Sequence, residues 1–344
     1  MKGCPYGTHR VIEPKGLLPQ PAWRINNDME IYDNEILIDV ISLNIDSASF
    51  TQIKEQARNE GRTVESIVSE TVERRGKQHN PVTGSGGMLI GTIKEIGALL
   101  KGKIDLMEGD KVATLVSLSL TPLKINKIKN IREDSDQIDI EGQAILFESG
   151  IYAKLPKDMD EKLALAVLDV AGAPAQTARL VNPEDTVVVI GAGGKSGILC
   201  LYEAKKKAGA KGKVIAIEYS KEGCDRIIKS QLADIVIQGD ATNPIAILES
   251  ILEVNAQNLA DITINCVNIQ NTEMATILAT KDRGKVYFFS MATSFTAAAL
   301  GAEGVGKDID MLIGNGYAKD HSEIALGILR ESKTIRDMFE EIYV

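Results

Sequence analysis

A run of strand-forming residues, Thr186 to Ile190, leads into a glycine-rich turn and then into a helix-like stretch from Gly197 to Ala208. This order suits a phosphate site because the turn must be tight and the backbone must approach a pyrophosphate closely. The free N–H groups at the helix start must also face the anion. The sequence therefore predicts a dinucleotide-binding turn that uses the following residues: Gly191, Gly193, Gly194, Lys195, Ser196 and Gly197.

The sequence of this turn differs from the GxGxxG pattern, because Ser196 occupies the position of the third glycine. Gly191, Gly194 and Gly197 give GxxGxxG instead. Glycines also serve ordinary turns, so the triplet alone is weak evidence. Lys195 could neutralise pyrophosphate charge or simply extend into solvent.

A second strand, Lys213 to Glu218, ends in an acid 21 residues beyond Gly197. A carboxylate at this place accepts hydrogen bonds from the adenosine ribose and repels a 2′-phosphate, which favours NAD over NADP. Ser220 is expected to add a ribose contact. Two nearby cations, Lys221 and Arg226, could instead help to hold a phosphate, so NADP stays possible.

Composition excludes several classes of protein. The 344 residues are 44% hydrophobic and 25% charged, as in soluble globular proteins. A net charge of -9 argues against nucleic-acid partners and anionic membranes. No apolar run approaches a bilayer span and the start of the chain has no signal core, so we expect a cytoplasmic protein. The four cysteines lie far apart in sequence and predict neither a disulfide nor a metal site.

Three regions differ in pattern. Residues 1–162 are rich in strands and turns and predict a compact antiparallel barrel, with one polar helix-like insertion from Phe50 to Arg75. Residues 163–317 alternate strand and helix, which predicts an α/β fold with a doubly wound parallel sheet. Residues 318–344 predict an amphipathic helical tail that returns to the barrel.

The alternating region predicts strands at 186–190, 214–218, 235–237, 262–266 and 285–290. In such sheets the cofactor lies in the crevice at the carboxyl ends of the strands. We therefore expect cofactor contacts, rather than ordinary packing, from the residues that end two of these strands: Asn265, Cys266, Val267, Ser290, Met291 and Ala292.

Several landmarks resemble the medium-chain dehydrogenase/reductase superfamily, among them Gly109 to Val112 and Leu232 to Ile237. The resemblance implies a GroES-like β-barrel domain, a Rossmann domain and a homodimer. Zinc-dependent members carry a Cys where Asp46 falls here and a Gly-His-Glu near Met88 to Gly91, where this chain is apolar. We expect no catalytic zinc, because the protein ligands it needs are missing.

Longer strings are similar to the L-erythro-3,5-diaminohexanoate dehydrogenase family of anaerobic lysine fermentation. They include Cys4 to Pro14, Ala171 to Thr177 and His79 to Gly91. This resemblance implies an amine dehydrogenase that oxidatively deaminates the 3-amino group of 3,5-diaminohexanoate. The implied products are 5-amino-3-oxohexanoate, ammonia and reduced nicotinamide.

Such a reaction needs a base for the substrate ammonium and carboxylates that hold its amines. Asp46 is expected to supply the base or an amine partner, although it could be a turn-forming acid. His79 could act as base or shuttle, or face solvent. Glu148 could hold the distal ammonium, or be a surface acid. The substrate carboxylate would contact Arg10, Thr83 and Ser85, unless these residues only build the barrel surface and a flexible hairpin.

Two other functions stay open. A zinc-free NAD(P)H quinone or enone reductase also uses a GxxGxxG turn, although it usually has a basic or small residue where Glu218 stands. A non-catalytic NAD(P)-sensing protein would have the same fold without catalytic activity, and its cleft would lack titratable groups.

Overall fold

The structure is a computed structural model of the chain and describes residues 1–80, 84, 86–133, 135–290, 292–314 and 316–344, without the side chains of residues 47 and 48. These residues form two compact units, Met1–Asp158 (unit 1) and Met159–Val344 (unit 2). The three-part division at residues 162 and 317 stays a prediction. No helix in the described residues is long and apolar enough to cross a membrane.

Unit 2 is built on a six-stranded parallel sheet with the order β11-β10-β9-β12-β13-β14. Counted from β9, this order is 3-2-1-4-5-6, that of dinucleotide-binding sheets, and its switch point lies between β9 and β12. The prediction of a Rossmann-type sheet is confirmed. The strands are β9 (Thr186–Ile190), β10 (Lys213–Glu218), β11 (Ile235–Gln238), β12 (Ala260–Asn265), β13 (Thr280–Phe288) and β14 (Asp310–Ile313).

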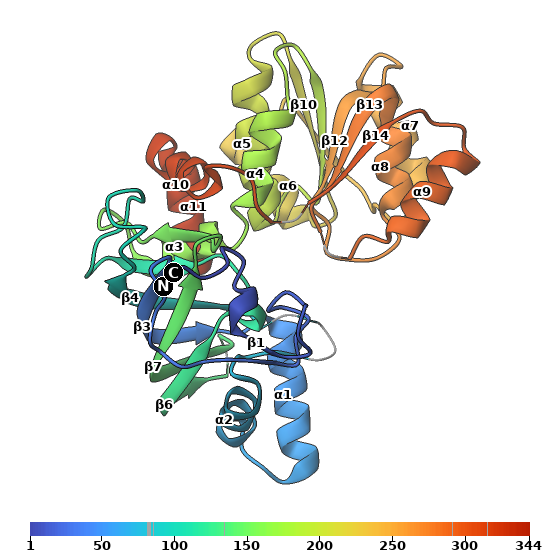
Figure 1. The fold of residues 1–344 in the computed structure, drawn as a ribbon. Coiled ribbons are helices and arrows are strands. Elements are labelled where there is room, and N and C mark those ends of the chain that lie inside the picture. Colours follow the sequence, from blue (N-terminus) through green and yellow to red (C-terminus); the bar gives the residue numbers. More distant parts are fainter. Residues whose placement is uncertain (81–83, 85, 134, 291, 315) are drawn as a thin grey trace. The chain divides into compact units, whose positions relative to one another are not determined.

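Helices cover both faces of this sheet, with α4, α5 and α6 on one side and α7, α8 and α9 on the other (Figure 1). The central strands are apolar on both faces, and Val188 and Ile215 are fully buried. The helices of unit 2 are α3 (Glu161–Leu168), α4 (Gly172–Leu180), α5 (Lys195–Ala208), α6 (Lys221–Ser230), α7 (Pro244–Val254), α8 (Glu273–Ala279), α9 (Phe295–Gly304), α10 (His321–Glu331) and α11 (Lys333–Tyr343).

Two features of this sheet differ from the prediction. Strand β13 begins at Thr280 and ends at Phe288 rather than spanning 285–290, and β14 was not predicted. The first residues of β13 include the exposed charged run 281–283, which carries no apolar alternation. Strand β14 has four residues that are exposed or only half-buried, so it lacks a core pattern as well.

The C-terminal tail is two helices rather than one. Ser332 ends α10 and begins α11, where its side chain accepts a hydrogen bond from the Ile335 N–H. Within unit 2, α10 packs against α3, α4 and α5, and α11 packs against α3. The expected return of the tail to the barrel stays a prediction.

Unit 1 contains a six-stranded antiparallel sheet with the order β6-β7-β3-β4-β5-β8. Its apolar face packs into one large core that includes Ile38 and Leu89, so the expected antiparallel barrel part of the fold class is confirmed. Two short strands, β1 (Val11–Glu13) and β2 (Arg24–Ile25), pair apart from it. The main strands are β3 (Glu35–Asn44), β4 (Met88–Ile96), β5 (Lys111–Thr114), β6 (Leu123–Arg132), β7 (Gln137–Phe147) and β8 (Tyr152–Lys154).

The predicted single insertion helix of unit 1 is a pair of helices, α1 (Ser47–Glu60) and α2 (Val64–Arg75). Gly61 ends α1 in the left-handed conformation with φ 63°, which glycine adopts without strain. Thr63 then begins α2 by accepting a hydrogen bond from the Ser66 N–H. The sequence from Phe50 to Arg75 is mostly polar, so its pattern did not indicate the break between α1 and α2.

Candidate functional site

The glycine turn of unit 2 lies at the switch point of the sheet. Gly191, with φ 74°, follows β9, and a Cβ added there would stand 2.9 Å from Cγ2 of Val267, which follows β12. A side chain at Gly197 would overlap the Gly191 carbonyl and Ala192. These two glycines are therefore required by the turn itself, because strand, turn and helix pack too closely for any side chain.

Gly194 differs from the other turn glycines because it faces open space. It is exposed, and its nearest neighbour would be the Gly191 carbonyl oxygen, 3.8 Å from an added Cβ. Gly194 begins α5, and no described side chain caps this helix end. The first N–H groups of α5 therefore keep their capacity to bind an anion, and the half-buried Ser196 belongs to the same first turn.

The carboxylate of Glu218 accepts hydrogen bonds from the glycine turn and from Ser220. Its Oε2 accepts a hydrogen bond from the Gly193 N–H at 2.8 Å. Its Oε1 accepts from both the N–H and the hydroxyl of Ser220, each at 2.9 Å. The acid predicted to contact the ribose thus lies against the glycine turn, together with Ser220, as a ribose site requires.

Lys195 is held at the start of α5 by two partners from other parts of unit 2. Its Nζ donates to Oδ2 of Asp169 at 2.7 Å and lies 5.4 Å from the centre of the Tyr343 ring. The Lys195 ammonium thus has partners within unit 2, in a hydrogen bond that is exposed to solvent. The nearby Arg226 donates to the Gly193 carbonyl at 3.2 Å, so two cations flank the turn.

The end of β12 is shaped by Asn265. This buried amide donates to the hydroxyls of Thr272 and Thr276 and accepts from the Val267 N–H at 2.9 Å. Asn265 therefore fixes the backbone of Cys266 and Val267 rather than offering free donors to a ligand. The Sγ of Cys266 lies 3.9 Å from that of Cys200, and both are free thiols.

The end of β13 is described in part. Ser290 accepts a hydrogen bond from the Ala292 N–H at 3.1 Å, which shapes the turn after the strand. Met291 lies outside the described residues. The cofactor contacts of this segment stay predictions.

In unit 1, Asp46 begins helix α1. Its Oδ1 accepts a hydrogen bond from the Ser49 N–H at 2.9 Å, as a helix-capping acid does. Its Oδ2 is buried and has no hydrogen-bond partner in the described part of the chain. The carboxylate thus combines a structural hydrogen bond with a free acceptor, and both of the functions considered for Asp46 are compatible with its position.

Other buried side-chain atoms of unit 1 also lack a partner among the described residues, including Oδ1 of Asn44, Oε1 of Gln78 and Nδ1 of His79. Gly86 and Gly87 bring their segments together. A side chain at Gly87 would overlap the backbone of Asn44, and one at Gly86 would overlap the Gln78 carbonyl. We call Asn44, Asp46, Gln78 and His79 the acceptor cluster.

Buried polar atoms almost always have hydrogen-bond partners, because an unpaired one costs about 1–3 kcal/mol. Asn80 donates to the Gln52 side chain of α1 at 2.8 Å, which places the segment after Gln78 along this helix. The four members of the cluster offer acceptors, and the charges of Lys77 and Arg75 lie close enough to act on His79. The acceptors match a ligand that brings several N–H donors, such as an ammonium group.

His79 is uncharged near neutral pH. Burial, and then the charges of Lys77 and Arg75, lower the pKa of His79 to about 4. Lys77 itself is buried and donates to the carbonyls of Pro19 and Gln20 at 2.6 and 2.8 Å. A neutral imidazole with a free ring nitrogen can accept a hydrogen bond from a bound ammonium, but the lowered pKa makes His79 a weak base.

The lowered pKa of His79 predicts a loss of stability in acid. The unfolded chain binds a proton at this residue near pH 6.5 and the folded chain only near pH 4, so stability falls as pH drops through this window. We expect the wild type to lose about 2 kcal/mol more than His79→Gln between pH 7.5 and pH 5. Urea unfolding at both pH values measures this difference; parallel losses would contradict it.

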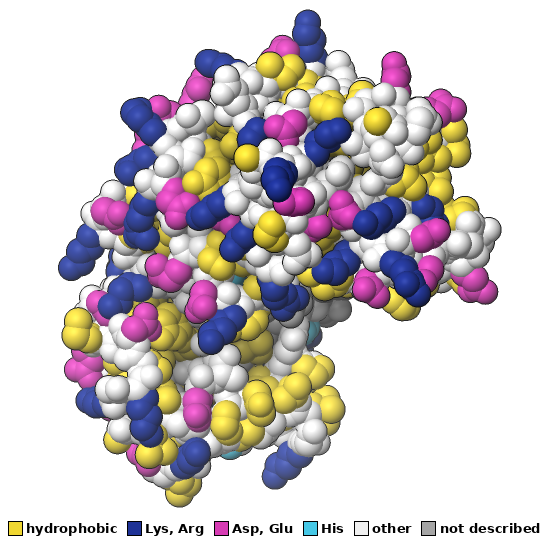
Figure 2. All heavy atoms as spheres, turned by 90° about the horizontal axis from the view of Figure 1, so that it is seen from above, with side chains coloured by type: hydrophobic (Ala, Val, Ile, Leu, Met, Phe, Trp, Pro, Cys, Tyr) yellow, Lys and Arg dark blue, Asp and Glu magenta, His cyan; other side chains and the backbone are white. Residues whose placement is uncertain are grey.

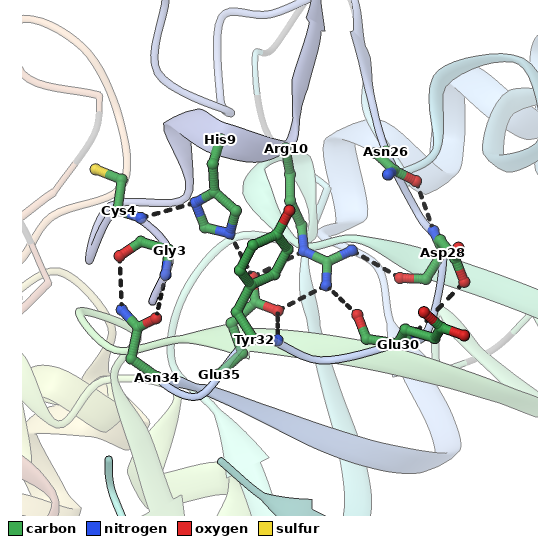
Figure 3. Close-up of polar contacts among 10 residues, drawn as sticks. All are labelled: Gly3, Cys4, His9, Arg10, Asn26, Asp28, Glu30, Tyr32, Asn34 and Glu35. Carbon is green, nitrogen blue, oxygen red and sulfur yellow. Dashed lines mark hydrogen bonds and ion pairs between the residues drawn. The ribbon is translucent and has the colours of Figure 1, made fainter. Parts of the chain in front are cut away.

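The Arg10 guanidinium forms hydrogen bonds with other residues of unit 1 (Figure 3). It is 2% exposed, and its Nε and Nη2 donate to the two carboxylate oxygens of Glu35 at 2.7 and 2.6 Å. It also donates to the carbonyls of Asp28 and Glu30, each at 2.6 Å. Four of its five N–H groups are thus used. Arg10 holds the N-terminal segment and is not available to a substrate carboxylate.

Glu148 lies with this N-terminal network rather than with Asp46. It is exposed and accepts a hydrogen bond from Asn34 at 2.8 Å. Asn34 immediately precedes β3, whereas Asp46 follows the other end of that ten-residue strand, roughly 30 Å away along an extended chain. The structure therefore brings Asp46 and His79 into one region of unit 1, and Arg10 and Glu148 into another.

Thr83 and Ser85 lie outside the described residues, so their contact with a substrate carboxylate stays a prediction. Within the described residues, no group of three or more His, Cys, Asp or Glu side chains is placed to hold a metal ion. Lys and Arg side chains are interspersed with Asp and Glu over the face drawn in Figure 2.

Several residues of the acceptor cluster and of the glycine turn's surroundings could not be predicted from the sequence. Asn44 lies at the end of a predicted strand, and Gln78 immediately precedes the string that begins at His79. Neither an asparagine nor a glutamine by itself indicates a catalytic or binding function. Asp169 and Tyr343 reach Lys195 from 26 and 148 positions away. No local pattern could have found them.

Comparison with known proteins identifies relatives over the full length. The chain is 61% identical over 344 residues to L-erythro-3,5-diaminohexanoate dehydrogenase of Acetoanaerobium sticklandii, covering 100% of both chains. It is 59% identical over 345 residues to the Fusobacterium nucleatum protein of that name, covering 100% of this chain and 99% of the relative. The family profile of the N-terminal domain of this dehydrogenase matches residues 9–156.

Solved structures resemble the fold at low identity. The alcohol dehydrogenase TADH from Thermus sp. ATN1 has a TM-score of 0.53 at 17% identity, over 90% of this chain and 85% of that one. A mycobacterial protein, Rv1454c, complexed with NADPH has a TM-score of 0.54 at 14% identity, over 93% and 85%. These likenesses support the fold class.

Proposed function

Since the chain belongs to the L-erythro-3,5-diaminohexanoate dehydrogenase family and is therefore an oxidoreductase, we propose that it oxidatively deaminates L-erythro-3,5-diaminohexanoate. The products would be 5-amino-3-oxohexanoate, ammonia and reduced nicotinamide. The observation that carries this proposal is the identity of 61% and 59%, over the full length, to relatives of that name. The buried acceptors of unit 1 without partners are compatible with a substrate that brings two ammonium groups.

The proposal assigns the nicotinamide cofactor to the glycine turn of unit 2. When bound, the cofactor supplies a hydride acceptor. The open face of Gly194, the uncapped start of α5 and the two flanking cations Lys195 and Arg226 fit its pyrophosphate. The hydrogen-bonded pair of Glu218 and Ser220 fits its adenosine ribose.

The acceptor cluster would supply the proton chemistry. A protonated amine cannot release hydride from its carbon, so the ammonium must first lose a proton, which the Asp46 carboxylate would accept. Neutral His79 would accept a hydrogen bond from the amine. Hydride then leaves the carbon and an iminium remains. Water adds to the iminium and ammonia departs. One substrate, one water and one oxidised cofactor thus give one ketone, one ammonia and one reduced cofactor, with release of a proton.

NAD is the proposed cofactor, because the Glu218 carboxylate would repel a 2′-phosphate. We expect Glu218→Gln to raise the ratio of kcat/KM for NADP to that for NAD by about ten-fold, since Gln loses the charge while one of the two acceptor oxygens stays. Initial rates with both cofactors measure the ratio. Glu249→Gln, the same change at an exposed position of α7, serves as the control. An unchanged ratio in Glu218→Gln would contradict this cofactor assignment.

The enzyme would act in the cytoplasm, in lysine fermentation, as a homodimer. Edge strand β14 pairs only with β13 within the described chain, so its free edge can pair with a second copy. Sedimentation analysis should give about twice the chain mass of 37.2 kDa; a monomer would contradict the dimer.

A substrate panel separates this function from the two alternatives. We expect the absorbance of reduced nicotinamide at 340 nm to rise with L-erythro-3,5-diaminohexanoate and not with lysine or a simple secondary alcohol. Oxidation of NADPH by quinones or enones, without activity on the diamino acid, would favour the reductase. Nucleotide binding without turnover of any substrate would favour the sensor.

A further inference from the structure

The C-terminal helix lies beside the dinucleotide turn within unit 2. Ile335 and Phe339 of α11 are buried, and the helix packs against α3. A cavity of about 630 Å³ separates α11 from α6 and is lined by Arg226 of α6 and Asp337 of α11, among others. Because Arg226 donates to the Gly193 carbonyl, this side of α11 faces residues that touch the glycine turn.

Tyr343, near the end of α11, contacts the Lys195 ammonium through its aromatic ring. Its ring is half-buried, and the Lys195 ammonium lies 5.4 Å from its centre. Burial raises the pKa of the Tyr343 phenol and the charge of Arg226 opposes the rise, so both cations of the turn act on this side chain. Asp169 holds the Lys195 ammonium at 2.7 Å through a hydrogen bond.

These contacts restrict a side chain that would otherwise be flexible. A lysine on a helix surface loses up to about 2 kcal/mol of rotamer entropy when a ligand fixes it. Lys195 has already lost part of that freedom, because the Tyr343 ring and the Asp169 carboxylate confine its ammonium. A cation placed beforehand at the start of α5 binds an anion there more tightly than a mobile one.

We infer that Tyr343 is a positioning residue of the cofactor site, which holds the Lys195 ammonium for the dinucleotide pyrophosphate and makes α11 part of that site. The inference rests on the proposed binding of the cofactor at the glycine turn. It adds a residue from the far end of the chain that the turn motif does not contain.

The test is a double-mutant cycle on NAD binding with the full-length protein. We expect Tyr343→Leu to raise the dissociation constant for NAD about two- to five-fold, the usual worth of a cation–π contact. Tyr343→Phe keeps the ring and should keep the wild-type constant. In Tyr343→Leu, KM for NAD should rise while kcat at saturating NAD stays unchanged. In a Lys195→Met background, Tyr343→Leu should have no further effect.

A matched control lies on the same helix as Lys195. Tyr202 of α5 has the Lys206 ammonium 5.8 Å from its ring centre, so Tyr202→Leu makes the same change at another Lys–Tyr pair. It should leave NAD binding unchanged. If Tyr343→Leu lowers the melting temperature, Tyr343→Met replaces it, because its longer, unbranched side chain adapts to the space left by the ring.

Three results would overturn the inference: an unchanged dissociation constant in Tyr343→Leu, an equal loss in Tyr343→Phe, or an undiminished loss in the Lys195→Met background. Failure of the wild type to bind NAD at all would instead remove the proposed cofactor site. Isothermal titration of wild type and variants with NAD distinguishes these cases.

Discussion

Asp46→Asn should lower kcat about a hundred-fold or more while leaving the dissociation constant for NAD and the stability unchanged. The carboxylate has two oxygens in different surroundings. Oδ1 accepts from the Ser49 N–H at the start of α1, and Oδ2 is the buried acceptor of the cluster. Asparagine caps a helix about as well as aspartate, so the substitution removes the charge and the free acceptor but keeps α1 intact.

Asp160→Asn is the matched control for this prediction. Asp160 begins α3 and accepts hydrogen bonds from the N–H groups of Lys162 and Leu163 at 2.8 and 3.4 Å. The same chemical change at this helix start should leave kcat at the wild-type value. Steady-state rates at saturating NAD, with thermal melting of each variant, measure both effects. Full turnover in a folded Asp46→Asn protein would remove Asp46 from the mechanism.

Gly194→Ala should weaken NAD binding more than ten-fold without unfolding the turn. In the protein alone, a methyl group at Gly194 meets nothing closer than 3.8 Å, and its φ of −79° suits any residue. The added methyl group would stand on the open face where the pyrophosphate must approach the backbone. Alanine at a helix start costs at most about 1 kcal/mol relative to glycine, so stability changes little.

Gly327→Ala controls for this substitution, because Gly327 also faces open space but lies inside α10. It should bind NAD as the wild type does. Titration with NAD and thermal melting of both variants measure the difference. If Gly194→Ala bound NAD normally, the pyrophosphate would not lie against this turn.

The sheet of unit 2 could be predicted because its signals are local. A run of β-branched residues followed by glycines defines β9 and the start of α5, and Glu218 ends the next strand at the expected distance. Strand β14 and the first half of β13 could not be predicted, because their burial pattern depends on neighbours elsewhere in the chain.

The functional residues divide in the same way. Asp46 was found through its position in a family pattern, and the structure adds the free Oδ2 that makes it a candidate. Arg10 appeared in an unusual string, but residue type alone could not show that Glu35 neutralises it in the interior. Burial alone would raise the pKa of Glu35, yet hydrogen bonds and the charge of Arg10 hold it below its usual range.

The ratio of ammonia to reduced cofactor tests the central claim most directly. With L-erythro-3,5-diaminohexanoate and NAD, we expect one ammonia for each reduced nicotinamide throughout the reaction, because loss of hydride from the amine-bearing carbon precedes hydrolysis. Reduced nicotinamide that forms without ammonia would show that a different bond of the substrate is oxidised and would contradict oxidative deamination.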